Sequence, residues 1–551
     1  MPAAPDGGRR AATGWGLVDH APDAEEVAGT RELLAGRFGE DALWTSPPPP
    51  PAPTPTPRIR IPDALADVVS ADAAVRRLHA VGRSFADTVA LRETGVARTP
   101  DLVARPGDEA AAAAVLDWCH DEGLACIPFG GGTSVVGGVT PPAGDAPVVT
   151  LQLRGLDRVT DVDPVSGAAL VQAGASGPRL ESQLRPHGLT MRFFPQSFEL
   201  STLGGWIATR AAGHYATGPV HVDDLVESVT AITPAGRWAS RRLPGSGAGP
   251  SPDRLLIGSE GILGVVTEAW VRVQERPAAK MSAAIRFADF DDAVRALAPR
   301  VRTGLQPSNC RVLDPVEALL AGAGDGRTSV LVLGAESPPI AGADVQALVE
   351  GRMAAMTALL ADLGGEPAAA NRPAPDRTAP GGADADADAD QAWRRSFLRA
   401  PYLRDVMVDA GMVVETFETA MTHDRLVGFI ADVRAATQAA VAEVCGDGIV
   451  TCRITHAYPD GAAPYLTVIA PGRPAARAAQ WGEIKAAAAE AIMAAGGTIT
   501  HHHAVGRDHR PWYDAQRPEP FAAALSAAKA AVDPRGCLNP GVLVGPAVRR
   551  T

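Results

Sequence analysis

The feature that most constrains the fold of this chain is a glycine-rich stretch, Ile127-Pro-Phe-Gly-Gly-Gly-Thr-Ser-Val-Val-Gly-Gly138. Adjacent glycines let a backbone approach an anion closely, and the exposed N–H groups and hydroxyls of such a loop supply donors. The stretch is not a Rossmann fingerprint, because its glycines are contiguous and the segment after them is extended. A plain tight turn is the alternative. We interpret the stretch as a loop that holds the diphosphate of a flavin dinucleotide through Pro128, Phe129, Gly130, Gly131, Gly132, Thr133 and Ser134.

Two further segments support this interpretation, namely Pro195-Gln-Ser-Phe-Glu-Leu-Ser-Thr-Leu-Gly-Gly-Trp-Ile-Ala-Thr-Arg-Ala-Ala-Gly213 and Ile257-Gly-Ser-Glu-Gly-Ile-Leu-Gly-Val-Val-Thr267. With the first loop, they resemble the FAD-binding segments of the vanillyl-alcohol oxidase/PCMH flavoprotein superfamily in order and rough spacing. The resemblance covers the chain from Gly14 onward. It implies that FAD is also bound by Gln196, Ser197, Phe198, Glu199, Leu200, Ser201, Thr202, Thr209, Arg210, Ala211, Ala212, Glu260, Gly261, Ile262, Leu263, Gly264, Val265 and Val266.

This resemblance also implies an architecture. The class is α+β, with a PCMH-type two-part FAD-binding domain, an α+β substrate-binding cap domain and a helical C-terminal segment. Superfamily members that attach the flavin covalently commonly offer a His or Cys, whereas this first loop offers only Gly, Thr, Ser and Val. We therefore expect FAD to be bound non-covalently.

Length and composition restrict the class of protein. A chain of 551 residues with 46% hydrophobic content can bury more than one core. A net charge of −12 argues against nucleic acid or an anionic membrane as the main partner. No stretch approaches the roughly 18 consecutive apolar residues of a membrane span. The six cysteines are scattered without the close pairs of zinc or redox motifs, and we interpret them as reduced, mostly buried thiols. We expect a cytoplasmic enzyme and leave open a homodimer and a peripheral attachment to a membrane surface.

Composition also divides the chain into regions. Residues 1–94 form an N-terminal helical and linker region with a proline-rich stretch at 47–57, where helix is excluded. The FAD-binding domain is expected at 95–277, the cap domain at 278–500, and a segment that returns to the FAD domain at 501–551. Residues 366–391 contain an Ala-Asp repeat with almost no apolar content, which predicts disorder.

Local patterns predict several elements. A helix is expected around Glu25 to Phe38, and a second, with acids at its start, from Asp108 to His120. Strands are expected at Val148 to Leu153 and Ala168 to Gln172, and Ser176 is expected to cap a helix that Pro186 and Gly188 end.

Three consecutive histidines, His501, His502 and His503, lie in a segment that ends in a glycine turn. If the segment is extended, their side chains alternate and at most two share a face. A single histidine here would most simply be a packing residue, but three in a row are hard to explain by packing. An internal run this short in a patterned segment is not a cloning tag.

The histidines narrow the resemblance to alkyldihydroxyacetonephosphate synthases, in which His-His-His, a small residue, Val and Gly occupy this place. Flavin-linked 2-hydroxy-acid dehydrogenases carry Gly-Glu-His-Gly there, with a metal-binding Glu, whereas this chain has His502. The resemblance thus disfavours a metal. It assigns a catalytic role to Arg311, a substrate-binding role to Arg404 and an acid/base role to Tyr465; the alternatives are a surface charge for each Arg and half-buried packing for the Tyr.

By this resemblance the enzyme is an FAD-dependent transferase. It would exchange the acyl group of acyl-dihydroxyacetone phosphate for a long-chain alcohol, forming an ether without net oxidation. Such a substrate needs an Arg for its phosphate and a base, from His501 to His503 or Tyr465, for the proton beside its carbonyl. The alternatives are an FAD-linked 2-hydroxy-acid or alcohol dehydrogenase or oxidase, and a flavin-binding regulator that has lost catalysis.

Overall fold

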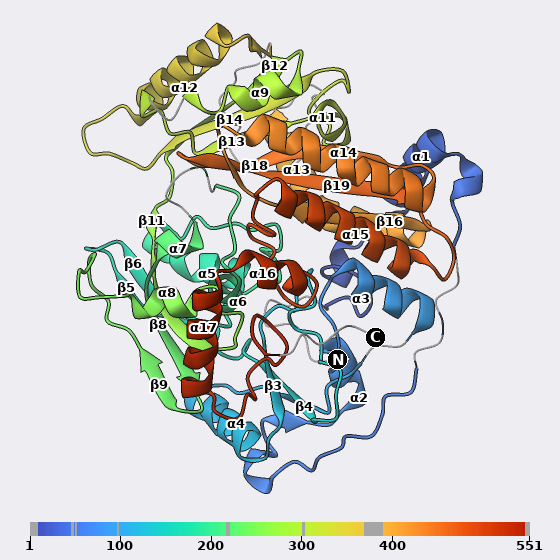
Figure 1. Cartoon of the computed structure of the whole chain (residues 1–551). Coiled ribbons are helices and arrows are strands. Elements are labelled where there is room, and N and C mark those ends of the chain that lie inside the picture. Colours follow the sequence, from blue (N-terminus) through green and yellow to red (C-terminus); the bar gives the residue numbers. More distant parts are fainter. Residues whose placement is uncertain are drawn as a thin grey trace.

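The computed structural model describes residues 9–45, 49, 52–95, 98–215, 217, 221–299, 303–368 and 389–545, with the backbone only for 389–395. Figure 1 shows two layers of the molecule. One layer contains a four-stranded and a five-stranded sheet, and the other contains a larger sheet with helices along it. The α+β class expected from the sequence is confirmed.

The first sheet has the order β1-β2-β4-β3. Its strands β2, β4 and β3 are parallel, and β1 pairs antiparallel with β2. The bounds are β1 Val69–Ser70, β2 Leu102–Ala104, β3 Ala125–Phe129 and β4 Val148–Gln152, with α2 Ala73–Leu78, α3 Phe85–Val89 and α4 Glu109–Asp121. The glycine loop follows directly from the end of β3, so this sheet positions it.

The second sheet is antiparallel, in the order β5-β6-β10-β8-β9. Its strands are β5 Val159–Asp163, β6 Ala168–Gln172, β8 Val226–Thr233, β9 Gly236–Ala239 and β10 Val265–Arg272. Around it lie α5 Gly177–Leu184, α6 Leu203–Thr209, α7 Val222–Leu225 and α8 Pro252–Leu256. A two-stranded ribbon pairs β7 Leu189–Thr190 with β11 Gln274–Glu275.

The largest sheet is antiparallel, in the order β15-β12-β14-β13-β18-β19-β16, with β17 beside β19. Its strands are β12 Ala279–Phe287, β13 Asn309–Leu313, β14 Ser329–Ser337, β15 Glu366–Pro367, β16 Met412–Glu418, β17 Met421–Thr422, β18 Ile449–Ala457 and β19 Gly461–Pro471. One face packs against a large apolar core with α9 Phe290–Arg295, α12 Val345–Asp362, α14 Leu426–Cys445 and α15 Arg477–Ala494. The opposite face bears the polar side chains described below, because strand residues alternate between faces.

Both ends of the chain contribute to this arrangement. Helix α1 Ala24–Phe38 packs against α13 Ala389–Asp409, and α11 Pro315–Leu320 follows β13. The C-terminal α16 Arg510–Gln516 and α17 Glu519–Val532 precede a tail in which Leu538 bridges to Cys126 of β3. The tail therefore packs against the two smaller sheets.

Most predicted elements are present. A capping box between Asp23 and Glu26 starts α1, and Asp108 caps α4. Ser176 occupies the N-cap position of α5, but its side chain makes no capping hydrogen bond. Strand β1 was not predicted; it lies in the region expected to hold only helix and linker.

The disorder predicted for 366–391 is wrong at both ends of that stretch. Residues Glu366 and Pro367 form the short edge strand β15, which pairs with β12. This pairing uses backbone groups, so it does not require apolar side chains. Helix α13 begins at Ala389. Residues 369–388 of that stretch, and residues 47, 48, 50 and 51 of the proline-rich stretch, lie outside the described residues. Among the described residues, no helix is both long and apolar enough to cross a membrane.

Candidate active site

A cavity of about 640 Å³ lies at the junction of the three sheets. Its walls come from the glycine loop, the segments near 196–213 and 260–266, the polar face of the largest sheet, α13, α1 and the histidine segment. A volume of this size suits a bound organic molecule. The cavity brings together parts of the chain that are hundreds of residues apart.

The glycine loop has the free N–H groups that an anion needs, and its surroundings leave no room for side chains at two of its glycines. Among the described residues, the backbone N–H groups of Gly131, Gly132 and Thr133 donate to no protein acceptor. A Cβ at Gly131 would lie 2.1 Å from the Leu200 carbonyl oxygen, and one at Gly130 would lie 2.2 Å from the Thr202 hydroxyl. The glycines thus permit close approach of the second segment, while free N–H groups remain for a diphosphate.

Nineteen of the expected FAD-binding residues line the cavity: Pro128, Phe129, Gly130, Gly131, Gly132, Thr133, Ser134, Gln196, Ser197, Ser201, Thr202, Thr209, Ala211, Ala212, Glu260, Gly261, Gly264, Val265 and Val266. Six do not. Phe198 packs near Gly177, Glu199 accepts a hydrogen bond from Tyr402, and Arg210 is paired with Asp223. Leu200, Ile262 and Leu263 are buried.

Glu260 links the flavin side of the cavity to the histidine segment. Its carboxyl oxygens accept from the backbone N–H groups of Val505 and Gly506, each at 2.8 Å. Burial raises the pKa of this carboxyl to about 7, against the opposing effect of those two donors. Glu260 therefore fixes the backbone that directly follows the histidines.

Strand register aligns three polar residues on the cavity side of the largest sheet. Tyr465 of β19 is the pairing partner of Glu418 of β16 on one side and of Arg453 of β18 on the other. All three side chains are buried. Cross-strand neighbours of this kind lie close enough to interact directly.

Arg453 controls the surroundings of the Tyr465 phenol. Its guanidinium stacks on the phenol ring and donates to Glu317 at 2.9 Å, while the phenol hydroxyl bonds to the side chain of Thr416. Burial raises the pKa of Tyr465, and the Arg453 charge partly offsets that rise. Tyr465 is thus a proton donor or acceptor held beside a fixed cation.

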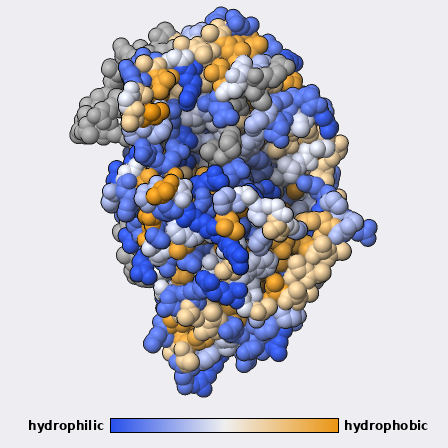
Figure 2. Space-filling model, turned by 90° about the vertical axis from the view of Figure 1, so that its left-hand side faces the viewer, coloured by the Kyte–Doolittle hydropathy of each residue, from blue (hydrophilic) through white to orange (hydrophobic). Residues whose placement is uncertain are grey.

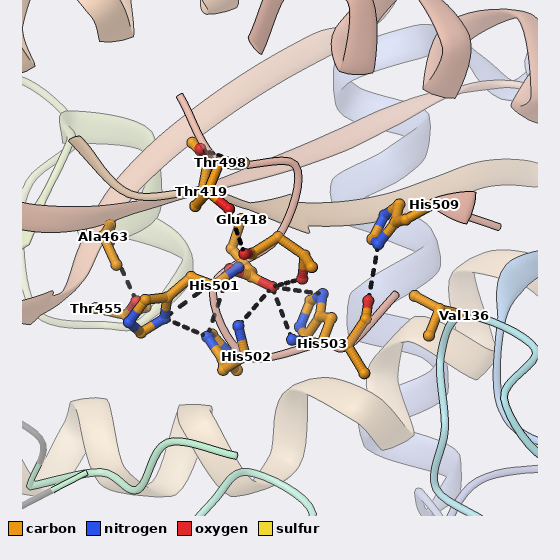
Figure 3. A network of polar contacts seen from close by, with 12 residues as sticks. Val136, Glu418, Thr419, Thr455, Ala463, Thr498, His501, His502, His503 and His509 are labelled. Carbon is orange, nitrogen blue, oxygen red and sulfur yellow. Dashed lines mark hydrogen bonds and ion pairs between the residues drawn. The ribbon is translucent and has the colours of Figure 1, made fainter. Parts of the chain in front are cut away.

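The histidine segment is bent, not extended, so the alternation of side chains that an extended segment would give does not apply. The carboxylate of Glu418 accepts from the backbone N–H groups of all three histidines, and this draws the segment into a turn (Figure 3). The Nδ1 atoms of all three rings lie 3.6 to 3.9 Å from that carboxylate. His502 and His503 line the cavity, whereas His501 does not.

These imidazoles are neutral at neutral pH. Burial lowers the pKa of His501 and His502 to about 3 and that of His503 to about 4, although the Glu418 carboxylate opposes the shift. Burial also opposes ionisation of Glu418, but the histidine rings and the N–H of His502 hold its pKa below the usual range. Neutral imidazoles are available to accept a proton.

Two arginines expected in the site also line the cavity. Arg311, in β13, is 1% exposed and donates to the carbonyl of His214 at 2.6 Å and to Asn309 at 3.0 Å. Arg404, in α13, donates to the carbonyl of Arg83 at 2.9 Å and is partly exposed. Neither arginine is a solvated surface charge.

Three ring nitrogens, one each from His456, His501 and His502, lie within 4.8 Å of one another, as a metal site would require. The His456 ring bonds through Nε2 to the Gly213 carbonyl and through Nδ1 to Thr455. His501 bonds to Tyr458 and to His502. Hydrogen bonds therefore link the members of this cluster, and the absence of a metal from it stays a prediction.

Sequence reasoning missed Glu418, Arg453, Glu317 and His456. The alternation of polar with apolar residues in 449–457 could have placed Arg453 on the cavity face. Glu418 gives no such signal, because its role depends on a contact with residues more than 80 positions away.

The comparisons with known proteins agree with this geometry. Residues 100–240 match the family described as FAD binding domain, and residues 276–543 match FAD linked oxidases, C-terminal domain. Alkyldihydroxyacetonephosphate synthase of Dictyostelium discoideum is 28% identical over 513 residues, covering 88% of this chain and 79% of that protein. The chain belongs to the PCMH-type FAD-binding superfamily. FAD is the cofactor of this flavoprotein, as the glycine loop indicates.

Within the superfamily, this flavoprotein is similar to the synthases along most of its length. A solved alkyldihydroxyacetonephosphate synthase structure has a TM-score of 0.78 at 23% identity, covering 96% of this chain and 98% of that one. The mitochondrial D-lactate dehydrogenase [cytochrome] of Arabidopsis thaliana is 32% identical, but over only 40% of this chain and 38% of its own length. Similarity to the synthases therefore extends much further along the flavoprotein.

Proposed function

We propose that this flavoprotein is an alkyldihydroxyacetonephosphate synthase-type transferase that replaces the acyl group of acyl-dihydroxyacetone phosphate with a long-chain alcohol. The observation that carries the proposal is the composition of one cavity. Its lining includes two of the expected arginines, a phenol, two neutral imidazoles, the flavin loops and many apolar side chains.

Arg404 and Arg311 suit the phosphate of such a substrate. A guanidinium forms charge-assisted, often bidentate hydrogen bonds to phosphate oxygens. We assign phosphate binding to Arg404, which is the more exposed, and a supporting role to Arg311, whose donors are partly engaged by His214 and Asn309.

Tyr465, His502 and His503 supply the proton chemistry. A base must remove a proton from the carbon beside the carbonyl, and an acid must return one. The neutral imidazoles serve as bases, and Tyr465, whose pKa is raised by burial, serves as the acid. His501 contacts Tyr458 and His502 and supports the His502 ring.

FAD would be held by the glycine loop and by the cavity-lining residues of the two following segments, and when bound it supplies an electron-accepting ring for exchange without net oxidation. The residues of this chain bind and orient the substrate, exclude water and move its protons. All of them come from one chain, so the proposal needs no second subunit.

The apolar part of the cavity opens among exposed leucines. Leu33 of α1 and Leu319 and Leu320 of α11 line the cavity and are 66%, 54% and 45% exposed. On the face seen in Figure 2, apolar side chains lie in separate patches among hydrophilic ones. We propose that these leucines rest on a membrane, from which the fatty chains enter.

The six cysteines are free thiols, which supports a reducing compartment and therefore the cytoplasmic side of that membrane. Co-sedimentation with phosphatidylcholine vesicles tests the attachment. Changing Leu33, Leu319 and Leu320 together to Asp should abolish it, whereas Leu348→Asp, at an exposed position on α12, should not. Equal sedimentation of both variants would contradict the attachment.

The ether product tests the reaction. We expect purified protein, incubated with acyl-dihydroxyacetone phosphate and hexadecanol, to give the alkyl product by mass spectrometry. Tyr465→Phe should keep FAD but lose about 10²- to 10⁴-fold in rate, since only the hydroxyl is removed. Reduction of a dye by D-lactate without any ether would favour the dehydrogenase alternative.

Acid should release free FAD, and flavin left on the denatured chain would contradict non-covalent binding.

A further inference from the structure

We propose that Glu418 is a positioning residue that holds the histidine turn and sets the tautomer of His503, with the proton on Nδ1 and the lone pair on Nε2. The role of His503 as a base rests on the proposed function. The geometry of the turn and the tautomer of His503 do not depend on it. The proposal assigns the role of base to one of the three histidines and names the residue that prepares it.

The first step is the hold on the backbone. Oε1 of Glu418 accepts from the N–H groups of His502 and His503, at 3.0 and 2.8 Å, and from the Thr500 hydroxyl at 2.7 Å. Oε2 accepts from the N–H of His501. Four donors on consecutive residues converge on one carboxylate that has no solvent exposure. Hydrogen bonds to a charged acceptor are stronger than neutral ones, so this turn is firmly held.

The second step concerns the ring of His503. Its Nδ1 lies 3.8 Å from Oε1 of Glu418. A lone pair pointing at an anion is repelled, whereas an N–H is attracted. The Nδ1–H tautomer is therefore favoured, and Nε2 keeps its lone pair. The ring lines the cavity and lies edge-on to Tyr465, with centroids 5.5 Å apart.

The other two rings are restrained by one another. The Nδ1 atoms of His501 and His502 lie 3.0 Å apart, so one of the two must donate and the other accept. Nε2 of His501 is also engaged, with the Tyr458 hydroxyl at 2.9 Å. His503 has no such competing bond among the described residues, and this singles it out as the base.

Other titratable or charged groups surround Glu418 and the histidines. They come from the start of α7, from β18, from the turn between β18 and β19, from β19 and α15, and from the segment before α16. They comprise His221, Arg453, His456, Tyr458, Tyr465, Lys485 and His509. Lys485 pairs with Glu415, which points to the opposite face of β16. In the part of the chain that the structure describes, Glu418 is the one carboxylate within 4.0 Å of all three Nδ1 atoms.

The tautomer can be measured directly with ¹⁵N-histidine-labelled protein. Loss of signals in His503→Gln would assign His503 among the 12 histidines. Near pH 7 we expect a protonated Nδ1 and an unprotonated Nε2 at His503. Protonation at Nε2 in the wild type would overturn the proposal, and this readout does not depend on enzyme activity.

Two substitutions separate charge from shape. Glu418→Gln keeps the length but removes the charge, and Glu418→Asp keeps the charge but shortens the side chain. We expect Gln to move the His503 proton toward Nε2 and to lower kcat by about 10²-fold or more, with KM nearly unchanged. Asp should retain the tautomer and exceed Gln in kcat. The opposite order, or a Gln variant like the wild type, would overturn the proposal.

Glu181→Gln is the matched control. Glu181 is a buried carboxylate that accepts from a threonine hydroxyl and a backbone N–H, those of Thr190 and Met191, away from the cavity. It should change neither the tautomer nor kcat. Flavin content reports folding in every variant. If Glu418→Gln lost FAD, the proposal would be tested by the His503 tautomer in the wild type and in Glu418→Asp. If the wild type formed no ether, the proposed function would fail while the tautomer measurement would still test Glu418.

Discussion

The guanidinium carbon of Arg453 lies 3.9 Å from the centroid of the Tyr465 ring, and the two residues are direct neighbours on β18 and β19. A cation over a phenol ring is attracted to its π-electrons and also stabilises a negative charge on its oxygen. The stack therefore combines packing of the ring with control of its proton.

Arg453→Lys should impair the reaction and move the alkaline limb of its pH profile to higher pH. Lysine keeps a charge for Glu317 but loses the planar stack on the Tyr465 ring. The charge that lowers the pKa of Tyr465 then acts more weakly, so burial raises that pKa further. The pH dependence of kcat checks this. Arg434→Lys, at an ion pair between α14 and the N-cap residue of α11, Asp314, is the control and should leave the profile in place. An unchanged profile for Arg453→Lys would show that the stack does not tune the phenol.

Arg404→Ala should weaken binding of the phosphorylated substrate while FAD content stays the same. Loss of a charge-assisted contact costs on the order of 1.5–3 kcal/mol, or about 10- to 150-fold in affinity. Titration with acyl-dihydroxyacetone phosphate measures it. Arg399→Ala, on the same helix but paired with Glu26 outside the cavity, should bind normally. If both variants bound equally well, phosphate recognition would have to be reassigned.

Chelation should leave the activity intact. The three clustered histidines bond to Gly213, Thr455, Tyr458 and one another, so binding a metal would sacrifice existing hydrogen bonds. We expect far less than one equivalent of metal per chain by elemental analysis and full activity after dialysis against EDTA. Stoichiometric zinc, with activity lost on its removal and restored on its return, would make His456, His501 and His502 a metal centre.

The parts of the site that depend on local patterns could be predicted from the sequence, and those that depend on distant pairing could not. The glycine loop and the histidine triplet are contiguous, and their chemistry is visible in the residue types. Glu418 reaches the histidines only because β16 pairs with β19 and the chain returns after α15. The bend at the histidines is imposed by this distant carboxylate, so the local sequence alone could not reveal it.

Stability should fall as the pH is lowered from 7 to 5, and His509 should account for a measurable share. This ring is 3% exposed, its Nδ1–H donates to the Ala504 carbonyl at 2.9 Å, and burial lowers its pKa to about 3. The unfolded chain takes up the proton near pH 6.5 but the folded chain does not, so each pH unit below that value favours unfolding. By pH 5 this single group costs about 2 kcal/mol. The difference in unfolding free energy between the wild type and His509→Gln should therefore shrink by that amount between pH 7 and 5, measured by denaturant titration at each pH. Carboxylates titrate alike in both proteins and cancel in the difference. A difference independent of pH would mean that His509 becomes charged within the folded protein.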